Sequence, residues 1–159
     1  MKRIKLGDIF EINTPEGKAY LHYIYRDESL GELIRVLPGL YVERPTDFNE
    51  LAASKEMYMI FFPLPASYRG KMVELVGYYP ADKFGMPKYM REELIIRGEF
   101  LGWYIINIRT RQRKLVKTLT KEQKELSSWG TWNGAFLIEM LTNGWTLENW
   151  GSEWTSDKK

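Results

Sequence analysis

The chain has 159 residues, a length that predicts one domain, residues 1–159, with enough material to bury a core. Charged residues make up 28% and hydrophobic residues 44%, which excludes the disordered, collagen-like and coiled-coil classes. With a formal net charge of +2, no cysteine and one histidine, the sequence also excludes disulfide scaffolds, thiol catalysis and zinc sites built on cysteine or histidine pairs.

The first third of the chain predicts antiparallel strands joined by tight turns. Asp8–Ile12, Ala19–Arg26 and Leu33–Leu37 are rich in apolar and aromatic residues, and the second of them alternates between two faces. Residues 13–17 and Pro38-Gly39 supply the proline and glycine that turns require. Three short strands with tight turns predict a meander that curls into a small barrel-like sheet.

The middle of the chain predicts further strands separated by two long loops. The predicted strands are Met57–Phe62, Met72–Tyr79, Glu93–Ile96 and Gly102–Ile108. Both loops contain proline, which cannot donate to a strand ladder. The polar segment Glu43–Ser54 fits either a loop or one short helix.

The end of the chain predicts two helices. Thr120 and Gln123 match a capping box, which predicts a short helix from Lys121 to about Leu126. Asn133 can cap a second helix over residues 135–141. Strands followed by helices predict an α+β domain: a curled, mostly antiparallel sheet of about six or seven strands with two carboxy-terminal helices packed on it.

Motifs for catalysis are missing from the sequence. His22, the single histidine, lies on a predicted strand between Leu21 and Tyr23, where we interpret it as a residue that fills one face of the sheet. The chain contains no Gly-x-Ser-x-Gly elbow and no phosphate-binding glycine loop. We therefore predict that the protein is not an enzyme and has no cofactor or metal site; a hydrolase that uses His22 is a third hypothesis.

Basic residues gather in one segment of the chain, from Arg109 to Lys124. It holds seven basic residues and one acid, Glu122, a local charge of +6 that leaves about −4 for the rest of the chain. Such a segment can face nucleic acid or an acidic protein, or it can be a solvated hairpin and helix face. The candidate partner-binding residues in this segment are Arg109, Arg111, Arg113, Lys114 and Lys117.

Tryptophan is concentrated in the last 31 residues, which hold five of the six. Most of these rings are expected to pack in the core. Trp150 and Trp154 lie in a polar segment and are predicted to be partly exposed. Because binding hot spots favour tryptophan and arginine, we add these two to the candidate partner-binding residues. The alternative for this tail is a terminal strand docked by its rings.

Both ends of the chain resemble the immunity protein 26 family. The resemblance rests on Lys5–Ile12 with Gly17 and Ala19-Tyr20 at the start, and on Leu119–Gln123, Trp132-Asn133 and Asn143-Gly144-Trp145 at the end. It implies a cytosolic antidote that binds and neutralises a cognate toxin of a polymorphic or contact-dependent growth inhibition system. It carries over no functional residue, because no family motif defines a position of toxin contact.

The sequence therefore predicts an immunity protein, with a nucleic-acid-binding module that uses a barrel-like sheet and a basic hairpin as the alternative. The amino terminus has no apolar core of a secretory signal, and the most apolar stretch is short and broken by prolines. We thus expect a cytoplasmic protein with no membrane partner. Either its acidic remainder faces a basic toxin, or its basic segment meets an acidic toxin surface.

Overall fold

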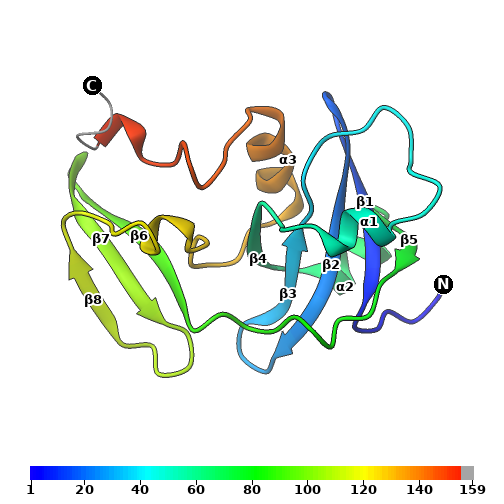
Figure 1. The fold of residues 1–159 in the computed structure, drawn as a ribbon, viewed down its shortest axis with the longest axis horizontal. Helices are drawn as coiled ribbons and strands as arrows, with labels where there is room; N and C mark the ends of the chain where they lie inside the picture. The colour runs from blue at the N-terminus through cyan, green and yellow to red at the C-terminus, as the bar shows by residue number, and fades with distance from the viewer. Residues whose placement is uncertain (155–159) are drawn as a thin grey trace. The chain divides into compact units, whose positions relative to one another are not determined.

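A computed structural model, shown in Figure 1, describes residues 1–154 of the chain. These residues form eight strands in two antiparallel sheets and divide into two compact units. The first unit comprises residues 1–86 and 130–144; the second comprises residues 87–129 and the segment from Trp145 onward. The predicted α+β class is confirmed, but the strands form two sheets rather than one. That residues 1–159 act as one domain stays a prediction.

The first unit contains an open five-stranded sheet. Its strands are β1 (Asp8–Thr14), β2 (Gly17–Asp27), β3 (Gly31–Val36), β4 (Tyr58–Phe62) and β5 (Val73–Tyr78). They are ordered β4-β3-β2-β1-β5, and every neighbouring pair is antiparallel. The first three strands form the predicted meander. The barrel-like closure is wrong, because β4 and β5 lie at opposite edges and do not pair with each other.

Three short α-helices belong to this first unit: α1 (Asn49–Ala53), α2 (Leu64–Arg69) and α3 (Gly134–Thr142). Residues 43–54 thus form a loop that ends in α1. The sequence did not predict α2, although Pro65 in its first turn lacks only an N–H that a helix start leaves unbonded anyway. Helix α3 was predicted, and Asn133 caps it by accepting a hydrogen bond from Phe136 N at 2.8 Å. Within residues 1–154, no helix combines the length and the apolar character needed to cross a membrane.

The second unit contains a three-stranded sheet with the order β6-β7-β8. Its strands are β6 (Tyr89–Ile96), β7 (Glu99–Asn107) and β8 (Arg113–Val116). The sequence predicted β7 and the second half of β6 (Glu93–Ile96) but not β8. Strand β8 is short, half charged and mostly exposed, and it is held by its pairing with β7. Two single 3₁₀ turns complete the unit, η1 (Gln123–Glu125) and η2 (Ser152–Trp154).

The predicted helix from Lys121 to Leu126 is only the single turn η1. Both capping-box bonds are present: Thr120 N donates to Gln123 Oε1 at 2.9 Å, and Gln123 N donates to Thr120 Oγ1 at 3.1 Å. The backbone carbonyls of Lys124 and Leu126 accept hydrogen bonds from Arg91 of β6. The segment therefore starts as a helix and is then held in an extended course along the sheet by a residue distant in the sequence.

A substitution at Gly77 in β5 can test the packing of the first unit. A Cβ at this position would lie 2.7 Å from Cδ2 of Phe48, whose ring is buried with Ile9 and Tyr20. We expect Gly77→Ala to lower the free energy of unfolding by at least about 1 kcal/mol, because the ring must leave its position in the core. Gly85→Ala is the control, since its Cβ would meet nothing within 4 Å. Equal urea midpoints for the two variants would contradict this packing.

Candidate functional site

His22 is fully buried on β2, and both of its ring nitrogens are engaged. Nε2 lies 2.7 Å from the carbonyl oxygen of Tyr79, and Nδ1 lies 2.9 Å from Nη1 of Arg35. Since a carbonyl only accepts and a guanidinium only donates, Nε2 carries the proton and Nδ1 accepts. Burial lowers the pKa of His22 to about 4, and Arg35 lowers it further against the opposing effect of the Tyr79 carbonyl. The interpretation of His22 as a residue that fills the sheet is confirmed.

Arg35, on β3, connects this histidine to the segment around α1. Its guanidinium donates to Glu56 Oε1 at 2.8 Å, to the Ala52 carbonyl at 2.8 Å and to the Ser54 carbonyl at 2.6 Å. It also lies against the ring of Phe84, 4.0 Å from the ring centre. A hollow of about 430 Å3 borders this cluster. The side chains at its base already bond to one another, so the arrangement holds loops in place and leaves no free nucleophile or base.

A second buried charge in the first unit is the Glu11 carboxylate on β1. It accepts hydrogen bonds from Tyr20 Oη at 2.9 Å and from Arg44 Nε at 2.9 Å, and it pairs with Lys18 at 3.4 Å. The hydrogen bond from Arg44 holds the pKa of Glu11 below its usual range, although burial acts in the opposite direction. The carboxylate is therefore ionised and fully occupied at neutral pH.

The basic hairpin turn between β7 and β8 is held by hydrogen bonds among its own residues. Asn107 Oδ1 accepts hydrogen bonds from the backbone N–H groups of Arg109 and Thr110, both at 3.0 Å. Arg111 has a positive φ of 67°, and its Nη1 donates to the Ile108 carbonyl at 2.7 Å. Its guanidinium carbon also lies 5.4 Å from the ring centre of Trp129. Both Arg109 and Arg111 are exposed, but the guanidinium of Arg111 is engaged by the Ile108 carbonyl and the Trp129 ring.

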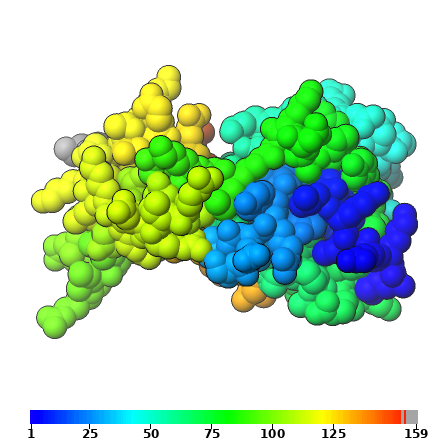
Figure 2. Space-filling view, turned by 90° about the horizontal axis from the view of Figure 1, so that it is seen from below, coloured from blue at the N-terminus to red at the C-terminus, as the bar shows by residue number. Residues whose placement is uncertain are grey.

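The remaining candidate cations point in different directions. Arg113 and Lys114 are consecutive in β8, so their side chains lie on opposite faces of the sheet. Arg113 pairs with Glu92 at 3.6 Å and lies over the Tyr104 ring at 5.3 Å. Lys117 follows the strand and is exposed. The segment lies on the surface of the second unit among the yellow-green and yellow atoms of Figure 2. Because Arg113 and Lys114 lie on opposite faces of the sheet, the candidate cations do not share one face.

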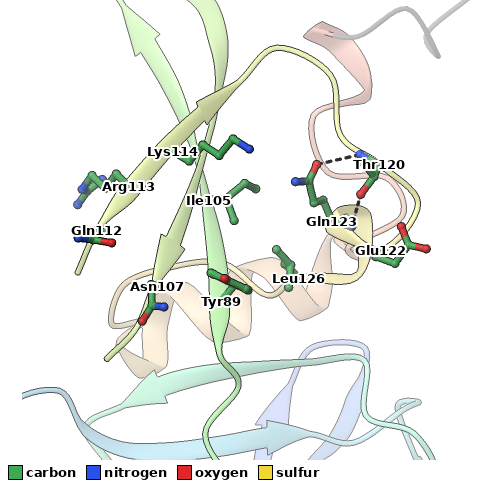
Figure 3. Close-up of a pocket in the computed structure, with 10 residues that line it drawn as sticks. All are labelled: Tyr89, Ile105, Asn107, Gln112, Arg113, Lys114, Thr120, Glu122, Gln123 and Leu126. Carbon is green, nitrogen blue, oxygen red and sulfur yellow. Dashed lines mark hydrogen bonds between the residues drawn. The ribbon is translucent and has the colours of Figure 1, made fainter. Parts of the chain in front are cut away.

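A cavity of about 550 Å3 opens on the Lys114 face of this sheet, as Figure 3 shows. The sheet contributes residues from all three strands and from the turn before β8, and the strap over residues 117–126, which follows β8, contributes the opposite wall. The sheet residues are Tyr89, Ile105, Asn107, Gln112, Arg113 and Lys114. Arg113 borders the cavity, but its side chain points away from Lys114, as Figure 3 shows. The strap residues are Thr120, Glu122, Gln123 and Leu126. The cavity thus combines apolar side chains with amide groups and a cation, a composition typical of binding sites.

Arg91, which the sequence analysis did not single out, lies behind the strap wall of this cavity. Its side chain is only 1% exposed and sits between the rings of Trp103 and Trp150, at 4.6 and 4.1 Å from their centres. It donates to the carbonyls of Leu126 at 3.1 Å, Lys124 at 3.0 Å and Leu147 at 3.2 Å. Burial lowers its pKa to about 10, so the guanidinium stays charged at neutral pH. This residue could not be found from the sequence pattern, because the predicted strand began at Glu93, whereas β6 begins at Tyr89.

Trp150 and Trp154 are half-buried, as predicted, and contact the sheet of the second unit. Trp150 Nε1 donates to Glu93 Oε2 at 2.7 Å, and the Trp154 ring stacks on Phe100 with an interplanar angle of 9°. Gly151 between them has a φ of 78°, and a Cβ there would lie 2.7 Å from the Trp103 ring. The tail is therefore docked by its rings, as turns rather than as a strand. These tryptophans anchor the tail and do not line the cavity.

Within residues 1–154, no three His, Asp or Glu side chains are grouped closely enough to hold a metal ion. No protein-family model matches the chain, and no curated protein or solved structure is significantly similar to it. The resemblance to the immunity protein 26 family therefore stays a prediction.

Proposed function

We propose that this chain is an immunity protein, which binds a toxin domain and blocks it by occupying its surface. The observation that carries the proposal is the cavity beside β8, which lies within the basic segment and combines apolar, amide and cationic groups. Binding hot spots are side chains that enter such hollows, and the surrounding contacts exclude water. A stable complex of this kind needs about 1,600 Å2 of total buried surface, which one unit of this size can supply.

The ionisable groups of the first unit support binding rather than catalysis. His22, Arg35 and Glu11 are buried and bonded to neighbouring groups of the chain. A general base needs a free nitrogen or oxygen within reach of a substrate. In this protein those atoms hold loops onto the sheet, which is the role of a rigid scaffold for a binding surface.

Co-expression tests the proposal. The chain is produced together with each toxin domain encoded in neighbouring reading frames, and we expect one of them to be neutralised and to form a stoichiometric complex on size-exclusion chromatography. A catalytically inactive variant of that toxin is the control and should bind equally well, because neutralisation needs no turnover. If every neighbouring toxin remains active and unbound, the proposal is wrong.

Nucleic acid is the second candidate partner, favoured by one local arrangement. Lys88 Nζ lies 5.3 Å from the ring centre of Tyr89, which is 38% exposed. An exposed ring beside a cation can stack a base and neutralise a phosphate. This function predicts binding of single-stranded oligonucleotides that weakens steeply with salt and is lost when Arg111 and Arg113 are both changed to Glu. Binding that is absent or independent of salt would exclude it.

A further inference from the structure

The floor of the cavity beside β8 is the face of the sheet that carries Ile105 and Lys114. Arg91 of β6 is paired with Ile105 of β7, and Ile105 is paired with Lys114 of β8. Directly paired residues present their side chains on the same face of a sheet. Because neighbouring strands are about 4.8 Å apart, the Cα atoms of Arg91 and Lys114 are about 10 Å apart. Ile105 therefore lies between the positions of Arg91 and Lys114, and of these two cations Lys114 lines the cavity.

Of these two cations, Lys114 lines the cavity, whereas the charge of Arg91 is met by its own surroundings, which include the Glu93 carboxylate on the same face of β6. Arg91 bonds to three carbonyls, and its buried Nη1 has no hydrogen-bond partner there. The Lys114 ammonium makes no ion pair with any described residue. The positive charge at the cavity wall is therefore assigned to Lys114, because Arg91 is buried behind the strap and faces carbonyls and the Glu93 carboxylate.

The nearby acids are directed elsewhere. Glu92 lies on the opposite face of the sheet, where it pairs with Arg113. Glu93 accepts the hydrogen bond from Trp150, and its negative charge acts on the buried Arg91. Glu122 is the one carboxylate among the lining residues, and Figure 3 shows its side chain pointing away from Lys114. The cavity therefore favours an anion.

The apolar part of the cavity is formed before any partner arrives. Leu126 lies opposite Ile105, and the Tyr89 ring closes one side, as Figure 3 shows. The strap is held by the capping box of Thr120 and Gln123 and by the bonds from Arg91 to its backbone. A preformed wall reduces the entropy lost on binding. A ligand that carries an apolar group beside its negative charge can contact both the apolar wall and the Lys114 ammonium.

We propose that this cavity receives an acidic segment of the toxin, with an Asp or Glu carboxylate on Lys114 and an adjacent apolar side chain on Ile105 and Leu126. The inference rests on the proposed function for the identity of the partner. Of the two arrangements that the charge distribution allows, it selects the one in which the basic segment meets an acidic toxin surface.

The anion preference can be measured without the toxin. Acetyl-Asp-Phe-amide and its uncharged analogue acetyl-Asn-Phe-amide are titrated into the isotope-labelled full chain, followed by two-dimensional NMR. We expect the acidic probe to shift the resonances of Ile105, Lys114 and Leu126, and to bind about fivefold more tightly than the amide, the size of a well-placed exposed charge pair. Lys114→Gln should remove this preference, whereas Lys117→Gln, an equal change of charge outside the cavity, should retain it.

Equal binding of the two probes, shifts centred elsewhere, or equal effects of the two lysine variants would overturn the inference. The toxin complex then separates it from the proposed function. If a toxin binds and Lys114→Glu weakens the complex at least about fivefold more than Lys117→Glu, both proposals hold. If a toxin binds and the two variants are equivalent, the function stands and this site is wrong. If no toxin binds, the function fails, and the probes alone decide whether the cavity is an anion site.

Discussion

Arg91→Met is expected to lower the free energy of unfolding by about 3 kcal/mol, because three backbone carbonyls lose their hydrogen-bond donor inside the second unit. The carbonyls belong to Lys124, Leu126 and Leu147, which lie in the strap and in the tail. A methionine fills similar space and removes the cost of burying a charge, but it cannot donate to these oxygens. The change should be read from urea unfolding followed by tryptophan fluorescence.

Arg113→Met is the matched control for this substitution. Arg113 lies two strands away from Arg91, is exposed, and makes one long ion pair at 3.6 Å with Glu92. Such pairs contribute between zero and about 1 kcal/mol, so the control should unfold close to the wild type. Arg91→Lys should fall between the two, because an ammonium keeps the charge but cannot reach three carbonyls in the geometry of a guanidinium. Equal losses for Arg91→Met and Arg113→Met would show that Arg91 does not hold the strap.

Acid is expected to destabilise the protein through His22 before most carboxylates titrate. The pKa of His22 is about 4 in the folded protein, against the usual value of about 6.5 in an unfolded chain. Between these two values the unfolded state binds more protons, so stability falls as the pH falls. From pH 7 to pH 5 this linkage amounts to about 2 kcal/mol. Protonation of Nδ1 would also set two cations, His22 and Arg35, against each other.

Urea denaturation at pH 7, 6 and 5 measures this loss. His22→Gln is the comparison, since glutamine keeps polar atoms at the site and does not titrate. We expect this variant to be less stable at pH 7 and to lose much less stability down to pH 5. Carboxylates such as Glu11, whose pKa is lowered by its partners, contribute only at more acidic pH. An unchanged slope in His22→Gln would assign the pH dependence to another group.

Much of the fold follows from local patterns. Seven of the eight strands were expected near their observed positions, since alternation and turn residues are local signals. Asn133 and the apolar spacing after it likewise predicted α3. The barrel-like closure was wrong because closure depends on which edge strands meet, and β5 pairs with β1 rather than with β4. Strand β8 was missed because its charged residues have no apolar pattern, and only the pairing with β7 makes it a strand.

The sequence predicted only some of the residues that line the cavity. Lys114 was a candidate, but the group to which it belonged included Arg113, which faces the other side of the sheet, and Trp150 and Trp154, which hold the tail. Once β8 is known to be a strand, alternation alone separates Arg113 from Lys114. Before that, the seven basic residues could only be treated as one segment.

By itself, the sequence determined the antiparallel α+β character, the lack of a cysteine framework and the concentration of positive charge between Arg109 and Lys124. Only the tertiary structure decided that Arg91 is buried and that Lys114 faces a cavity. Alternation along β6 puts Arg91 on one face, but that face is covered by the strap and by the tail, which follow more than 25 residues later. Burial of a charge is set by long-range packing. A local sequence pattern does not indicate which distant segment of the chain will cover a given face of a strand.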